Sequence, residues 1–193
     1  MSACKVLGIQ GSPCLDGTTA RLLDAALEGA RAEGAFVERI DLASVRLEPC
    51  RACEECSPGT GCVQTGDIMD RLYKEIRQVD GIALASPIFF MGVTAQTKAM
   101  IDRCQCFWIE KNVSKVDVYE GKRRPKGLFL SCAGSSKPGM FEPSLHVVRS
   151  FFAAIDYEYI GEVLLSHTDD PKLEARMPAA LESARAAGRK LCL

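Results

Sequence analysis

Apolar residues along this chain follow two alternating patterns. Short runs of consecutive apolar residues, typical of buried strands, are each followed by a segment in which apolar residues recur every three or four positions, as in an amphipathic helix. The predicted strands cover residues 5–10, 36–41, 81–86, 127–132 and 157–165. The predicted helices cover residues 18–34, 68–79, 94–103, 142–155 and 173–184. Five strand and helix units predict an α/β fold, with a five-stranded parallel sheet covered by helices on both faces.

The length of 193 residues suits one compact domain over residues 1–193. Two segments depart from the strand and helix pattern. Residues 48–66 contain a group of cysteines, and residues 104–125 carry charged side chains without a regular period. We therefore expect a cysteine loop at 48–66 and a surface excursion at 104–125.

The charges of the chain nearly cancel, because 24 basic and 25 acidic residues leave a formal net charge of −1. This balance provides no field that would attract nucleic acid or an anionic membrane. The longest uncharged run, residues 81–97, is interrupted by polar residues, glycine and proline, and residues 1–10 lack the apolar stretch of a signal peptide. We therefore expect a cytoplasmic protein that binds neither nucleic acid nor membrane.

The loop after the first predicted strand, residues 11–19, has the composition of an anion site. It combines three features that bind anions: backbone N–H groups, the positive end of a helix and several hydroxyl donors. It lacks the glycine spacing of a dinucleotide loop and the Gly-Lys-Ser/Thr ending of a nucleoside triphosphate loop. A terminal monophosphate is therefore the favoured guest, and a simple helix cap is the alternative. The candidate residues are Ser12, Cys14, Gly17, Thr18 and Thr19.

Two further loops follow strands that should end at the same edge of the sheet. Residues 87–92 are apolar and aromatic, which suits a flat ring but is also common in a core, and residues 133–136 are small. Three loops at one edge could hold a phosphate, a ring and the margin of that ring, which predicts flavin mononucleotide, FMN. The candidate residues are Pro87, Ile88, Phe89, Phe90, Met91, Gly92, Ala133, Gly134 and Ser135.

Four of the ten cysteines crowd into residues 50–62 with the spacing Cys-x2-Cys-x2-Cys-x5-Cys. Consecutive x2 spacings are typical of iron–sulfur loops, whereas structural zinc sites usually use two pairs separated by a longer stretch. The pattern favours one [4Fe–4S] cluster; zinc and metal-free cysteines are the alternatives. The candidate ligands are Cys50, Cys53, Cys56 and Cys62.

The remaining cysteines form no pattern. For the chain as a whole, the high cysteine count in a reducing compartment favours metal or redox chemistry over disulfides. We interpret Cys4 and Cys132 as small apolar residues at strand ends and Cys192 as part of a frayed terminus. Cys104 and Cys106 follow a predicted helix with a spacing that is poor for a metal site, so we assign them no metal role.

Taken together and in this order, the motifs resemble the iron–sulfur flavoproteins, a branch of the NAD(P)H-dependent FMN reductase-like superfamily with the flavodoxin-like fold. The motifs that carry the resemblance are Gly11-Ser12-Pro13, Gly17-x-Thr19, the four-cysteine run, Ser86-Pro87-Ile88-Phe89-Phe90 and Ala95-Gln96-x-Lys98-Ala99-x-Ile101-Asp102-Arg103. The resemblance implies FMN, a [4Fe–4S] cluster on the loop after the second strand, one-electron transfer between them, and a homodimer or homotetramer.

Carried over by position, the resemblance implies that Ser12, Thr18 and Thr19 hold the FMN phosphate. Cys14 stands where relatives often have arginine, and Phe89 stands where tyrosine is common. Lys98 and Asp102 match the family helix, but their i,i+4 spacing predicts a surface ion pair. Trp108 suits an interface, a flavin cover or the core.

Two functions from different classes follow. One is an FMN-dependent oxidoreductase that takes a hydride from NAD(P)H and passes electrons to the cluster or a small acceptor. The other is an electron carrier that a ferredoxin-like partner reduces. An NAD(P)H-dependent FMN or quinone reductase without a cluster, and a zinc-stabilised non-redox binding module, are the alternatives. We nominate no catalytic acid or base, because flavin chemistry belongs to the cofactor.

Overall fold

The computed structural model describes residues 3–56 and 61–193, and in these residues the sheet has five strands, all parallel. Residues 57–60, which belong to the predicted cysteine loop, lie outside the described residues. The strands are β1 (Lys5–Gln10), β2 (Phe36–Asp41), β3 (Gly81–Ala85), β4 (Lys126–Cys132) and β5 (Glu158–Leu165). Their order in the sheet is β2-β1-β3-β4-β5. This is the flavodoxin-like order, whose switch point lies between β1 and β3, and it confirms the predicted fold class.

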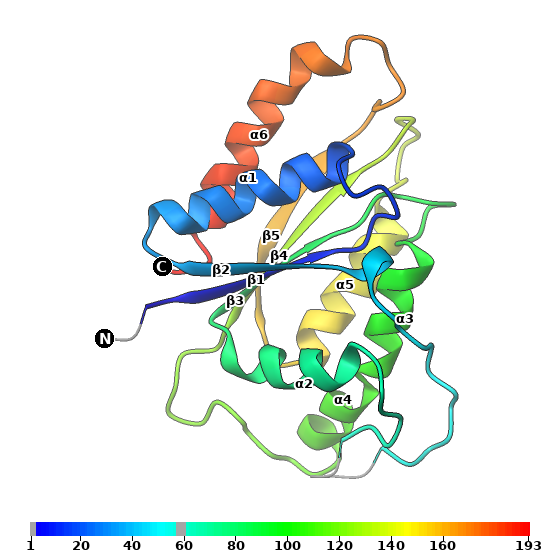
Figure 1. Ribbon diagram of the computed structural model, residues 1–193, viewed down its shortest axis with the longest axis vertical. Coiled ribbons are helices and arrows are strands. Elements are labelled where there is room, and N and C mark those ends of the chain that lie inside the picture. Colours follow the sequence, from blue (N-terminus) through cyan, green and yellow to red (C-terminus); the bar gives the residue numbers. More distant parts are fainter. Residues whose placement is uncertain (1–2, 57–60) are drawn as a thin grey trace.

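Helices cover both faces of the sheet (Figure 1). One face carries α1 (Thr18–Ala32) and α6 (Leu173–Arg189). The other carries α2 (Met69–Gln78), α3 (Ala95–Arg103), α4 (Gln105–Asn112) and α5 (Glu142–Ala154), and a short 3-10 helix, Leu42–Ser44, follows β2. Each face packs its own apolar core against the sheet. In the described part of the chain, no helix is long and apolar enough to cross a membrane.

The predicted elements form where the apolar pattern places them. All five residues of β3 are buried, because a parallel strand inside a doubly wound sheet is covered on both faces. In α2 the residues Leu72 and Ile76, four positions apart, are buried on one face. Gly34 ends α1 with a φ of 82°, and its N–H donates to the carbonyl of Arg31 over 2.9 Å.

The helices α1 and α6 approach each other so closely that their backbones are in contact. A Cβ atom built on Gly29 would lie 2.9 Å from the carbonyl carbon of Arg185, and one built on Gly188 would lie 2.6 Å from that of Ala26. Real Cβ atoms essentially never come so close to a backbone atom. Both glycines are therefore needed for the contact between the two helices rather than for a turn.

The segment 104–125, predicted as a surface excursion, begins with a packed helix. In α4 the adjacent residues Cys106 and Phe107 are buried, and the ring of Phe107 meets Tyr73 edge-on at 5.8 Å between centroids. The rest of the segment forms turns that are mostly exposed. The apolar pattern misses α4 because two adjacent buried residues create no helical period.

A disulfide joins Cys4 to Cys192, with their Cα atoms 5.9 Å apart. Cys4 precedes β1 and Cys192 follows α6, and the two ends of the chain lie on the same side of the molecule (Figure 1). The interpretation of Cys4 as a lone apolar residue and of Cys192 as part of a frayed terminus is therefore wrong. The 188 positions between them give no local signal of the pairing.

Candidate functional site

Two of the predicted loops, residues 11–19 and 87–92, are tied together at the carboxyl ends of β1 and β3, through Thr94 just after the second loop. The buried hydroxyl of Thr94 donates a hydrogen bond to the carbonyl of Gly11 over 2.5 Å. The N–H of Gly11 in turn donates to the carbonyl of Ala85 over 2.7 Å. The predicted phosphate loop and the predicted ring loop are therefore neighbours at one edge of the sheet.

The phosphate loop ends at a helix N-terminus that no side chain of the described residues caps. Gly17 is the N-cap of α1, and Thr18 is its first residue and partly exposed. Ser12 is buried and its hydroxyl accepts the N–H of Cys14 over 3.1 Å. Thr19 is also buried, with its hydroxyl oxygen 2.8 Å from the sulfur of Cys132. The first amides of α1 and Thr18 are thus suited to an anion, whereas the Thr19 hydroxyl is engaged inside the fold.

Cys14, which stands where relatives often have arginine, is exposed at the rim of the phosphate loop. Its thiol donates to the carboxylate of Asp16 over 3.3 Å. A neutral thiol beside a carboxylate adds no positive charge to the loop. Any anion bound here therefore depends on backbone N–H groups and hydroxyls.

Buried hydrogen bonds fix the direction in which the ring loop leaves β3. Ser86 is fully buried, and its carbonyl accepts the hydroxyl of Ser131 over 2.8 Å. Pro87 follows as a buried residue, and the N–H of Ile88 donates to the carbonyl of Cys132 over 2.8 Å. The start of the ring loop is thereby fixed to the end of β4.

The ring loop then makes a tight turn that exposes apolar side chains. Phe89 and Gly92 exchange two backbone hydrogen bonds of 2.9 and 3.0 Å, and between them Phe90 and Met91 have φ angles of 49° and 64°. A residue other than glycine in this region costs about 1–3 kcal/mol, and such strain is concentrated at functional sites. The exposed fractions of Phe89, Phe90 and Met91 are 51%, 107% and 47%. This turn therefore presents an apolar surface suited to a flat ring.

The third predicted loop, residues 133–135, lies at the same edge and is partly covered by the loop after β5. The N–H of His167 donates to the carbonyl of Ser135 over 3.2 Å. A Cβ atom built on Gly134 would lie 2.7 Å from the carboxylate carbon of Asp169. Asp169 is therefore a neighbour of the candidate site that the sequence pattern did not identify.

A buried amide beside the phosphate loop gives a further test of whether FMN fits. Gln10, the last residue of β1, is completely buried, and its side-chain nitrogen and oxygen have no hydrogen-bond partner among the described residues. A buried polar group without a partner costs about 1–3 kcal/mol. An uncapped helix end, exposed aromatic rings and this unsatisfied amide together fit a ligand with a phosphate, a polar chain and a flat ring.

The four candidate metal ligands lie on the loop between β2 and α2. Cys50 and Cys53 are exposed, whereas Cys56 and Cys62 are half-buried against the core that α2 and α4 cover. Over residues 3–56 and 61–193, no three His, Cys, Asp or Glu side chains converge closely enough to enclose a metal ion. The loop thus provides four thiols in one region, two of them on the core and two at the surface.

The pKa values of the two half-buried thiols shift in opposite directions. Burial raises the pKa of Cys56, and the three other thiols of the loop raise it further. Burial would also raise the pKa of Cys62, but contacts with Tyr73, the backbone of Gln64 and Arg103 outweigh burial and lower it. A lowered pKa favours the thiolate of Cys62, the form that binds iron. Four thiols on one loop have the chemistry of an iron–sulfur donor set.

A fifth thiol lies beside this group. Cys106 of α4 is buried, and burial, with the neighbouring thiols of Cys56 and Cys62, raises its pKa to about 11. Cys104 is also buried, and its pKa is raised for the same reason. Both thiols remain protonated at neutral pH, and their lack of a metal role stays a prediction.

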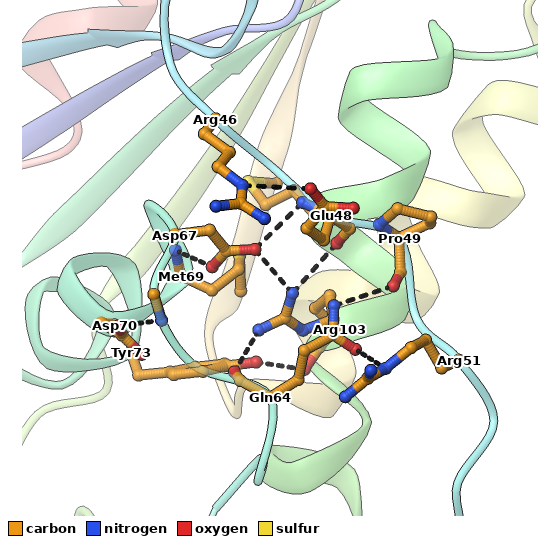
Figure 2. Close-up of polar contacts among 12 residues, drawn as sticks. Arg46, Glu48, Pro49, Arg51, Gln64, Asp67, Met69, Asp70, Tyr73 and Arg103 are labelled. Carbon is orange, nitrogen blue, oxygen red and sulfur yellow. Dashed lines mark hydrogen bonds and ion pairs between the residues drawn. The ribbon is translucent and has the colours of Figure 1, made fainter.

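Arg103, the last residue of α3, holds together the two ends of the cysteine loop (Figure 2). Its Nη1 donates to the carbonyl of Glu48 over 3.0 Å and lies 2.8 Å from Oδ2 of Asp67. Its Nη2 donates to the carbonyl of Gln64 over 2.6 Å. Glu48 lies two positions before the first candidate ligand, and Gln64 lies two positions after the last. We call Glu48, Gln64, Asp67 and Arg103 the loop neck; it holds the loop by protein contacts alone.

Sequence reasoning missed the loop neck. Arg103 is part of a motif that carries the family resemblance, but its partners lie 36 to 55 positions away in the chain. The ion-pair partner of Arg103, Asp67, lies just before α2, where its Oδ1 also accepts the N–H of Met69 over 2.9 Å. The two residues give no local signal that they form an ion pair.

The helix α3 connects the two candidate sites. Thr94 caps the N-terminus of α3, where the phosphate and ring loops meet. Arg103 is at the C-terminus of α3, in the loop neck. Nine residues at 1.5 Å each span about 13 Å. The cysteine loop and the sheet edge therefore lie at the two ends of one rigid element.

Side chains on and just after this helix lie at the surface. Lys98 and Asp102 form the predicted surface ion pair, with nitrogen and oxygen 2.7 Å apart. Trp108 has 44% of its surface exposed, so it does not belong to the core.

Comparisons with curated proteins and family models agree with this architecture. The family model described as NADPH-dependent FMN reductase matches residues 4–168. An iron-sulfur flavoprotein of Methanocaldococcus jannaschii is 32% identical over 158 residues, which cover 82% of this chain and 76% of that protein. An iron-sulfur flavoprotein of Archaeoglobus fulgidus is 39% identical over 99 residues, which cover 51% of this chain and 44% of that protein.

Solved structures share the fold at lower identity. An NAD(P)H:quinone oxidoreductase from Methanothermobacter marburgensis matches with a TM-score of 0.74 and 22% identity, covering 98% of each chain. An FMN-dependent NADH-azoreductase of Bacillus anthracis, solved in complex with FMN, matches with a TM-score of 0.67 and 13% identity, covering 98% of this chain and 100% of that one. These likenesses concern the fold. The family match spans most of the sequence, so the chain belongs to the NADPH-dependent FMN reductase family and is an FMN-dependent oxidoreductase.

Proposed function

We propose that this protein is a cytoplasmic reductase that passes electrons between FMN and a [4Fe–4S] cluster on Cys50, Cys53, Cys56 and Cys62. The observation that carries the proposal is the placement of a four-thiol loop and a flavin-type sheet edge at the two ends of α3. Both candidate sites are therefore held by one helix of this chain.

At the sheet edge, the first amides of α1 and the hydroxyl of Thr18 would hold the phosphate of FMN. Phe89, Phe90 and Met91 would pack against the isoalloxazine ring, which would then shield their exposed surface from water. Gly134 and Ser135 would lie at the margin of the ring, next to Asp169. When bound, FMN supplies both hydride and single-electron chemistry, and the chain positions its ring.

At the other end of α3, the loop neck holds the cysteine loop. The surroundings of Cys62 favour its thiolate, the form that binds iron. Cys50 and Cys53 are exposed, so metal and sulfide can reach the loop from solvent. The loop neck lies outside the run of ligands, so the protein can fold before the cluster is inserted.

The donor and acceptor follow from the family and from the exposed ring loop. NAD(P)H needs only an open flavin face on which the nicotinamide can stack, and the apolar turn is open to solvent. A ferredoxin-like protein could instead reduce the exposed cysteine loop. We propose NAD(P)H or ferredoxin as donor, a small molecule as acceptor, and a homodimer or homotetramer as the assembly.

The experiment is anaerobic purification followed by iron, sulfide and flavin analysis of the parent protein and a Cys56→Ser variant. We expect about four irons, four acid-labile sulfides and one FMN per parent chain. Cys56→Ser should lose iron and keep FMN, because the flavin loops lie at the other end of α3. Cys14→Ser, which replaces a free thiol outside the cysteine loop, is the matched control for iron and should keep four irons.

Protein that binds FMN stoichiometrically but contains no iron when purified without oxygen would overturn the cluster proposal. It would favour the second candidate, an NAD(P)H-dependent reductase without a cluster, which the spread of the four thiols also permits. Stopped-flow mixing with NADH, NADPH and reduced ferredoxin then identifies the donor. Fast bleaching by a nicotinamide supports the enzyme, and reduction by ferredoxin alone supports the electron carrier.

A further inference from the structure

The guanidinium of Arg103 is a buried positive charge next to the four-thiol loop. Arg103 is 1% exposed although it carries a full charge at any physiological pH. It donates to the backbone on both sides of the loop (Figure 2). Its charge also lowers the pKa of the Cys62 thiol. Burying a cation is costly unless something negative compensates it.

Asp67 supplies one negative charge at this position. Its Oδ2 lies 2.8 Å from Nη1 of Arg103, and neither side chain is more than 1% exposed. The carboxylate also accepts the N–H groups of Glu48 and Met69, over 3.0 and 2.9 Å. The carboxylate oxygens are therefore engaged both by backbone donors and by the guanidinium.

One donor of Arg103 is left over. The Nε–H is buried and has no hydrogen-bond partner within the described ranges, although Nη1 and Nη2 each have one. A buried N–H of a cation without an acceptor is strongly unfavourable. Asp67 therefore does not satisfy every donor of the guanidinium.

We propose that the Arg103–Asp67 pair sets the reduction potential of the cluster that the cysteine loop holds. This inference rests on the proposed function. Reduction adds one electron to the cluster, supplied by the donor, and no bond forms or breaks. Because both charges of the pair are buried, solvent screens them little, so the cation stabilises the reduced state and the anion destabilises it. Arg103 would raise the potential, and Asp67 would lower it.

The experiment is an anaerobic redox titration of the intact holoprotein, followed by electron paramagnetic resonance of the reduced cluster. The variants are Arg103→Gln, which removes the cation, and Asp67→Asn, which removes the anion at nearly constant shape. Arg103→Gln should shift the cluster potential to more negative values, and Asp67→Asn should shift it to more positive values. We expect at least a tenfold change in the ratio of oxidised to reduced cluster at a fixed potential, which is 59 mV for one electron.

The opposite signs separate an electrostatic role from a structural one. Both substitutions break the same ion pair, so damage to the loop neck alone would shift the potential in the same direction in both variants. Lys98→Gln is the matched control, because it removes a cation from an exposed ion pair on the same helix. It should leave the cluster potential unchanged.

Shifts of the same sign, or no shift in variants that keep four irons, would overturn the inference while the proposed function stands. Loss of iron from both variants with FMN retained would assign the pair a structural role only and would also overturn it. If Arg103→Gln does not fold, Arg103→Lys takes its place, because it disturbs the same contacts and keeps the cation. An electrostatic role then predicts a potential near that of the parent for Arg103→Lys and a positive shift for Asp67→Asn, and a positive shift in both would overturn the inference. A parent protein without iron would instead overturn the proposed function, so the two failures are distinguishable.

Discussion

The contact between α1 and α6 leads to a stability prediction opposite in sign to the usual one. Replacing a glycine inside a helix by alanine normally stabilises a protein by about 0.5–1 kcal/mol, because alanine loses less conformational freedom on folding. At Gly29, however, a Cβ atom would lie 2.9 Å from the carbonyl carbon and 3.0 Å from the Cα atom of Arg185. Gly29→Ala should therefore destabilise this protein.

The magnitude follows from the atoms that would collide. They belong to the backbone of α6 and cannot rotate away, so the two helices must separate. Overpacking in a core costs about 1–3 kcal/mol, and a collision with backbone should reach the upper end of that range. For a domain of this size, about 3 kcal/mol lowers the melting temperature by about 6–12 °C.

Urea unfolding of parent and Gly29→Ala protein, followed by far-ultraviolet circular dichroism, measures the effect. The expected result is a lower midpoint with an unchanged slope. Ser183→Ala, at an exposed position of α6, is the control and should change the midpoint little. A Gly29→Ala midpoint equal to or above that of the parent would refute the argument that the two backbones touch.

Two further predictions concern the polar contacts of the site. Burial would raise the pKa of Asp67, but its hydrogen bonds to Glu48, Arg103 and Met69 outweigh burial and lower it. Its stabilising contribution is therefore complete above the unfolded-state pKa of about 3.9 and is lost as the pH falls through the lower folded-state value. Urea titrations from neutral to acidic pH should show a weaker acid dependence in Asp67→Asn, and an unchanged dependence would contradict this assignment. Thr94→Val removes the N-cap of α3 and leaves the Gly11 carbonyl unpaired, which should cost about 2–3 kcal/mol and weaken FMN binding. Thr94→Ser should behave as the parent in flavin titrations, and equal losses in both variants would show that the hydroxyl is not responsible.

The sequence alone determined the elements of the sheet and their class. Apolar periodicity is local, so the buried residues of β3 and the buried face of α2 could be recognised without coordinates. The end of α1 at Gly34 was readable for the same reason, because a glycine with positive φ is a local stop signal. Alternation of strands and helices then implied a parallel sheet.

The sequence also placed the candidate loops, because the carboxyl ends of parallel strands meet at one edge of a sheet. It could not show how the hydroxyls of those loops are used. Ser12 and Thr19 were both predicted to contact phosphate, yet the Thr19 hydroxyl lies against Cys132 inside the fold. The orientation of a hydroxyl depends on a neighbour 113 positions away, which no local pattern reveals.

Only the tertiary structure decided the contacts between distant parts of the chain. It paired Cys4 with Cys192 and brought Arg103 to both ends of the cysteine loop. It also buried the amide of Gln10 beside the phosphate loop. Each of these depends on where the doubly wound sheet brings separate elements together, because ion pairs and disulfides act over a few ångströms of space whatever their separation in sequence.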